Sequence, residues 1–108
     1  MKNGLYKVSF KTPLGQGNGV VVINNGSIKG GDSMMYYTGT FQLDGNQFTA
    51  NIHAGKHSDA PGMSSVFGLN DVDVKLQGTA TDTSATIQGS AAGVPQVTLQ
   101  AQLTLITE

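Results

Sequence analysis

Two stretches near the C-terminus alternate apolar and polar residues at every position, and this alternation restricts the possible fold more than any other feature. They are "DVDVKLQGTAT", residues 71–81, and "VTLQAQLTL", residues 97–105. Successive side chains of a β-strand point to opposite faces, so the pattern predicts two half-buried strands. A shift of one residue would expose the whole apolar set, which makes the register well determined. The residues expected to face inward are Val72, Val74, Leu76, Gly78, Ala80, Val97, Leu99, Ala101, Leu103 and Leu105.

Shorter runs and the turn residues between them predict six more strands. Asn25-Gly26 and Asp44-Gly45 favour tight hairpin turns, because such turns require residues that accept positive φ. A turn is also expected at "TPLGQG", residues 12–17, and the glycine-rich "GQGNG", residues 15–19, is interpreted as a turn as well. Residues 58–70 are expected to form an irregular loop, with a short helical turn near residues 63–68. The additional strands cover residues 6–10, 20–24, 27–31, 36–43, 47–54 and 85–89.

Eight short strands with one apolar face each favour an all-β fold, a mostly antiparallel up-and-down barrel. Closure of the barrel pairs every strand edge and so removes exposed edges. A β-sandwich is the competing architecture, since alternation alone does not distinguish the two. The chain of 108 residues is expected to form a single domain, residues 1–108.

The run "GVVVI", residues 19–23, is apolar at four successive positions, so both of its faces should be covered. We expect Val20 and Val22 to point into the barrel and Val21 and Ile23 to point outward. An exposed apolar patch usually marks a contact. The outward pair therefore predicts an interface, and with it a homodimer.

The best functional candidate is the cluster Met34, Met35, Tyr36 and Tyr37, which follows "GGD" at residues 30–32. The two glycines permit a sharp corner and Asp32 suits the turn after it, which places the cluster at a barrel rim. Methionine and tyrosine are enriched at interface centres. The alternative is that Tyr37 fills the barrel and Tyr36 covers a neighbouring strand.

Composition excludes several classes of function. The chain has no cysteine, so it forms no disulfide and no cysteine-ligated zinc site. Its six basic residues are all lysines, spread along a chain of net charge −1, and direct nucleic-acid binding is therefore not expected. No apolar run is long enough to be a signal peptide or to span a bilayer, which predicts a cytoplasmic protein without membrane contact.

No residue pattern indicates catalysis, a cofactor or a metal. His53, His57 and Asp59 share one face of an extended strand, yet the two histidines would stand about 13 Å apart, too far to bind one zinc ion. The serines at 58, 64 and 65 lie near His57 without a nucleophile-elbow pattern. A non-enzymatic protein with no cofactor is expected.

Most of the chain resembles the GrlR-type negative regulators of type III secretion. The resemblance rests on "MKNGLYKVSF", on "GNGVVVINNGSIKGGDSMMYYTGTF" and on "NIHAGKH". It implies a small lipocalin-like barrel that dimerises and sequesters a transcriptional activator by protein contact, without binding DNA. It also implies that the family's acidic activator-binding loop corresponds to Leu43–Gln47, where Asp44, Gly45 and Asn46 are the candidate partner-binding residues. This turn retains only Asp44 as an acid.

A small hydrophobic ligand inside the barrel is the alternative function. Glycine or alanine occupies several inward positions, which either leave space for a ligand or allow the barrel to flatten and pack shut. These positions are Gly39, Ala50, Gly78, Ala80, Ala85 and Gly89.

Overall fold

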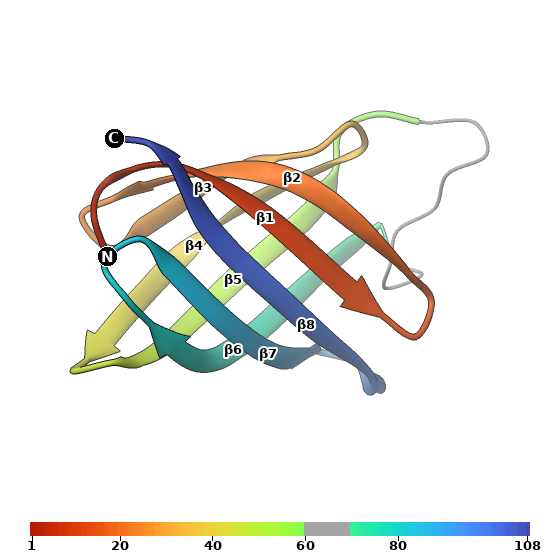
Figure 1. Ribbon diagram of the computed structural model, residues 1–108. Coiled ribbons are helices and arrows are strands. Elements are labelled where there is room, and N and C mark those ends of the chain that lie inside the picture. Colours follow the sequence, from red (N-terminus) through yellow and green to blue (C-terminus); the bar gives the residue numbers. More distant parts are fainter. Residues whose placement is uncertain (60–69) are drawn as a thin grey trace.

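The chain folds into one closed, antiparallel eight-stranded β-barrel, as a computed structural model of residues 1–59 and 70–108 shows (Figure 1). Each strand pairs with its neighbours in sequence, and β1 and β8 pair to close the ring. The strands are β1 (Gly4–Thr12), β2 (Gly15–Asn24), β3 (Ser27–Gly31), β4 (Met35–Asp44), β5 (Gln47–Lys56), β6 (Asp71–Ala80), β7 (Ser84–Ala91) and β8 (Val94–Thr107). The predicted all-β barrel is confirmed. The helical turn expected near residues 63–68 lies outside the described residues, and within them no helix is long and apolar enough to cross a bilayer.

The predicted inward faces of β6 and β8 form much of the core. Val72, Val74 and Leu76 are buried on β6, and Leu99 and Leu103 are buried on β8. Their neighbours in sequence, which are polar, are exposed. Alternation therefore located these strands and their register correctly, because one face of each is wet and the other is dry.

The predicted orientation of β2 is wrong. Val21 and Ile23 are 3% and 1% exposed, whereas Val20 and Val22 are 44% and 49% exposed. Residues directly opposite each other in an antiparallel pair point to the same face. Val21 lies opposite the buried Tyr6, so it must point inward.

The hairpin between β2 and β3 contains the information that determines the orientation of β2. Asn25 and Gly26 have φ values of 49° and 86°, as a type I′ turn requires, so the tight hairpin turn predicted here is confirmed. A two-residue turn at these positions pairs Ile23 with Ile28, the only branched apolar residue of β3. Ile28 is buried, and its orientation fixes that of β2.

The start of β2 is a second correction. "GQGNG" is a strand and not a turn, since β1 turns at Pro13 and Leu14 and β2 begins at Gly15. Gly17 lies opposite Phe10, and a Cβ atom there would come within 2.8 Å of the Phe10 ring. The glycine therefore lets an aromatic ring lie over the neighbouring strand inside the barrel.

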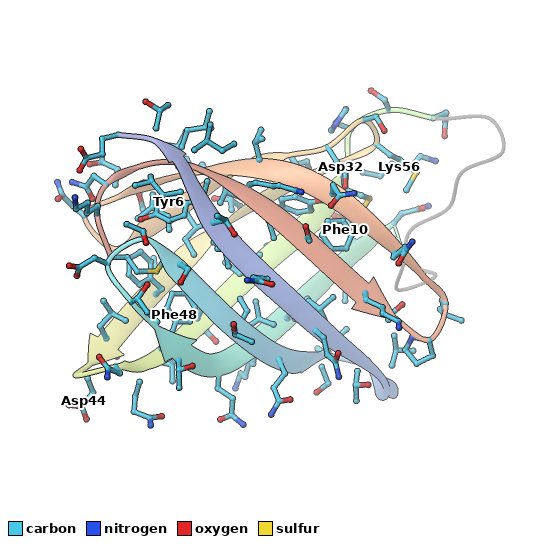
Figure 2. The ribbon with its side chains drawn as sticks, in the orientation of Figure 1. Tyr6, Phe10, Asp32, Asp44, Phe48 and Lys56 are labelled. Carbon is cyan, nitrogen blue, oxygen red and sulfur yellow. The ribbon has the colours of Figure 1, made fainter. Side chains whose placement is uncertain are left out.

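The two ends of the barrel differ in packing. At one end, called here the packed end, the side chains of Tyr6, Ile23 and Phe48 are fully buried. The Phe48 ring stacks on Phe41 with 5.2 Å between centroids. Figure 2 shows Tyr6 and Phe48 in one half of the barrel and Phe10 in the other.

The inward glycines serve close strand approach and do not leave space for a ligand. A Cβ atom at Gly39, Gly78 or Gly89 would clash with a backbone carbonyl oxygen of the adjacent strand. The absence of a side chain thus allows the strands to bend sharply and close a small ring. Ala50, Ala80 and Ala85 are buried in the core.

Candidate functional site

The barrel interior contains a cavity of about 180 Å³ that reaches from its middle towards the end opposite the packed end. This end, called here the cavity end, carries Phe10 and Asp32 (Figure 2), and Tyr37 contacts both of them. Most of the lining is aliphatic, including Val21, Ile28, Leu76, Ile87, Leu99 and Leu103. In the described part of the chain, polar side chains line it only near the mouth, from Gln16, Asn18, Asp32, Ser33 and Tyr37. The site is therefore an apolar hollow with a polar entrance.

Asp32 organises the turn that carries the predicted rim cluster. Its Oδ1 accepts hydrogen bonds from the backbone N–H groups of Met34 at 2.9 Å and Met35 at 2.7 Å. Its own N–H donates to the Met35 carbonyl oxygen at 2.9 Å. These bonds hold both methionine side chains in buried positions that line the cavity.

Tyr37 connects this turn to the cavity wall. Its hydroxyl donates to Oδ2 of Asp32, and its ring makes an edge-to-face contact with Phe10, 6.0 Å between centroids. Burial, followed by the hydrogen bond to the Asp32 carboxylate and its charge, raises the pKa of Tyr37 well above its ordinary value. The hydroxyl therefore stays protonated at neutral pH and remains a donor to Asp32.

The end of β5 supports the same turn from outside. The His57 N–H donates to the carbonyl oxygen of Met34 at 2.9 Å. His57 Nε2 lies 2.9 Å from the carbonyl oxygen of Asp32, which can only accept, so this ring nitrogen carries the proton.

Lys56 forms an ion pair with Asp59, and this pair holds the pKa of Asp59 below its usual value.

His53 belongs to a different surface. Its Nδ1 lies 2.8 Å from Asp73 and its Nε2 lies 3.2 Å from Asp71, on the outside of the barrel. The hydrogen bond to Asp73 raises the pKa of His53, and the weaker hydrogen bond to Asp71 acts in the same direction. His53 and His57 thus face separate groups, and the residues that the structure describes contain no cluster arranged to hold a metal ion.

The outer face of β2 to β4 carries a small apolar surface, called here the outer patch, which consists of Val20, Val22 and Tyr36. Tyr36 is 40% exposed. Val20 lies opposite Gly31, which lies opposite Tyr36, so the patch runs across three strands. The Tyr36 ring also covers Gly55 on β5, where a Cβ atom would meet it. The positions agree with the alternative interpretation of the rim cluster, since Tyr37 lies in the barrel and Tyr36 covers a neighbouring strand, and a role of the cluster at an interface stays a prediction.

The candidate partner-binding turn lies at the packed end. Asp44 ends β4, Gln47 begins β5, and Gly45 and Asn46 form the two central positions between them. Only Gly45 has positive φ, at 61°, which is the pattern of a type II′ turn. The whole turn is exposed, and Leu43 beside it is 41% exposed (Figure 2).

Fold and geometry together define a small closed β-barrel with an apolar internal cavity, packed shut at one end. No model of a known protein family matches the chain, and no curated protein sequence matches it.

Proposed function

We propose that this protein is a non-enzymatic regulator that acts by contact with a protein partner, a transcriptional activator or similar, in the manner that its resemblance to GrlR-type negative regulators implies. One observation carries the proposal. Val20 and Val22 are exposed on β2 and Tyr36 is exposed on β4, with Gly31 between Val20 and Tyr36, and exposed apolar side chains grouped on one face of a barrel favour a protein contact.

In the proposed function one surface forms the homodimer and a second surface binds the protein partner. The outer patch is the contact of a homodimer, because an isologous interface needs a self-complementary apolar surface. The exposed turn at Asp44–Asn46, with Leu43 beside it, contacts the partner. A cytoplasmic location is part of the proposal, since a transcriptional activator works there.

The test separates the two surfaces by single substitutions. Val22→Lys is expected to give a folded monomer at high micromolar concentration in sedimentation velocity, while the unchanged protein sediments as a dimer. Thr49→Lys, an exposed position on β5, is the matched control and is expected to leave the dimer intact. A monomer at every concentration of the unchanged protein contradicts the dimer.

Partner contact is tested by affinity capture from a lysate of the source organism, followed by mass spectrometry. We expect a regulatory or secretion-related protein to be recovered by the unchanged chain and lost with Asp44→Lys. The Thr49→Lys control is expected to retain it. If no regulatory protein is recovered, the regulator proposal fails.

A second candidate function is the binding of a small hydrophobic ligand inside the barrel. The apolar cavity of about 180 Å³ with a polar mouth favours it, since small-molecule sites are typically concave, largely apolar and marked by a few placed polar groups. Native mass spectrometry of the purified protein is expected to detect a retained small molecule, and Ala101→Leu, which fills the cavity, is expected to remove it. Identical spectra of both proteins at the mass of the bare chain count against this candidate.

A further inference from the structure

We infer that the cavity accepts a molecule of about one aromatic ring with a hydrogen-bond-donating head, a hydroxyl or an ammonium, and that it rejects carboxylates. This inference rests on the second candidate function, the internal ligand site, and specifies the chemical class of its ligand. Three observations carry it: the dimensions of the cavity, the charge at its mouth and the hydrogen-bonding groups there.

The volume limits the ligand to a small molecule. A dry cavity of about 150 Å³ lined by aliphatic and aromatic side chains is enough to hold benzene. The present cavity, at about 180 Å³, is slightly larger than that. Tyr6, Ile23 and Phe48 fill the barrel beyond it, so a long acyl chain has no room to extend towards the packed end. The site therefore suits a single ring with one short substituent.

Among the described residues, the lining of the mouth carries one negative charge and no lysine. Asp32 is the only charged residue that lines the cavity in the described part of the chain. Lys56 at this end forms an ion pair with Asp59, and residues 60–69 contain no ionisable side chain. Lys29 and Lys11 are exposed, and neither of them lines the cavity. Figure 2 shows Asp32 and Lys56 at the same end of the barrel. An anionic head entering here would meet a like charge at short distance, which is unfavourable.

The hydrogen-bonding groups at the mouth also favour a donor. The Tyr37 hydroxyl already gives its proton to Oδ2 of Asp32, so its oxygen can only accept a bond from a ligand. A carboxylate has about four acceptor positions in all. Two positions on Oδ1 of Asp32 accept backbone N–H groups, and one position on Oδ2 accepts the Tyr37 hydroxyl. One acceptor position on the carboxylate and one on the phenol oxygen are therefore left for a donating head.

The test uses three probes that share one ring and differ only in the head: benzyl alcohol, benzylamine and benzoate. Binding is followed by chemical-shift changes in two-dimensional NMR spectra of the full chain at pH 7. We expect the alcohol and the amine to shift the resonances of cavity residues such as Ile87 and Leu103, and benzoate to bind about ten-fold more weakly or not at all.

Asp32→Asn tests the origin of the discrimination. The amide oxygen still accepts from the Met34 and Met35 N–H groups, so the turn is expected to persist and thermal unfolding serves as the check on folding. The variant is expected to bind benzoate as well as benzyl alcohol. Asp44→Asn, which removes one negative charge at the packed end, is the matched control and is expected to keep the discrimination.

The outcomes distinguish the assigned ligand class from the internal ligand site on which it rests. If benzoate binds the unchanged protein as tightly as benzyl alcohol, the assigned ligand class is wrong while an internal ligand site stands. If none of the three probes binds and Ala101→Leu leaves the native mass spectrum unchanged, both are overturned.

Discussion

The packed end and the cavity end of the barrel are built by the same strands with the same alternation, and yet one is solid and the other hollow. At the packed end the side chains of Tyr6, Ile23 and Phe48 are fully buried, and none of them lines the cavity. At the cavity end the inward ring of Phe10 lies over Gly17, and Tyr37 lies against the turn at Asp32. Alternation therefore determines which side chains point into the barrel, whereas the volumes of those side chains determine which part of the interior is tightly packed.

The two inward tyrosines show the same contrast in their hydrogen bonds. The Tyr6 hydroxyl donates to the backbone oxygen of Lys2 at 2.6 Å, with that of Asp82 at 3.3 Å. These bonds tie the N-terminal segment and the turn between β6 and β7 to the packed end. Burial, with smaller contributions from Glu108 and Asp82, raises the pKa of Tyr6. Tyr37 instead bonds a side chain on an exposed turn, which belongs to the mouth of the cavity.

The largest effect is expected for a charge placed inside the packed end. Ile23→Lys buries an unpaired ammonium and should destabilise the protein by about 4 kcal/mol or more, enough to unfold a small domain. Val22→Lys, one residue away and exposed, should change the free energy of unfolding by less than about 0.5 kcal/mol. Urea denaturation followed by circular dichroism checks both. Equal losses would mean that β2 lies in another register.

The next effect compares one large ring at each end. Phe48→Ala should cost about 3–5 kcal/mol, because it opens a void among tightly packed groups. Phe10→Ala should cost less than half as much, since this half-buried ring already borders an empty volume. Denaturant midpoints of the two variants measure the difference, and similar midpoints would show that both ends are equally packed.

A smaller effect is expected from removing the two inward hydroxyls. Tyr6→Phe leaves two backbone oxygens without this donor and should cost about 1–2 kcal/mol. Tyr37→Phe should cost less, because Asp32 keeps its two backbone donors and reaches solvent. Thermal unfolding ranks the pair, and a larger loss for Tyr37→Phe would contradict the proposed order.

The smallest effect concerns His53, whose side chain lies on the outside of the barrel. Because Asp73 raises its pKa in the folded state, its stabilising contribution is present below the ordinary histidine pKa of about 6.5 and is lost as pH rises through the folded value. NMR titration should therefore give His53 a midpoint above 6.5. Asp73→Asn is expected to lower that midpoint towards the ordinary value, and an unchanged midpoint would remove Asp73 as the cause.

Sequence patterns predicted the fold closely where one face of a strand is polar. β6 and β8 were placed correctly because water and core alternate at every residue along them. β2 was oriented wrongly because four successive apolar residues carry no such contrast, and only pairing with Tyr6 and Ile28 decides between the two faces.

The candidate site was predictable in part. The rim position of residues 34–37 followed from the glycines and Asp32 before them, since both are turn residues with known preferences. The bond from Tyr37 to Asp32, the support from His57 and the packing of Phe10 on Gly17 did not follow, because they join residues whose distance depends on how the strands close.

Period-two alternation and hairpin turns are enough to predict eight antiparallel strands, each with one buried face. Closure of these strands into a barrel and not a sandwich, the choice of exposed valines on β2 and the position of the open interior follow only from the three-dimensional arrangement. Alternation is a local property of each strand and can be recognised in its own residues. The free interior volume depends on the whole molecule, because it is the volume that the closed barrel encloses minus the volume of all the side chains that point into it.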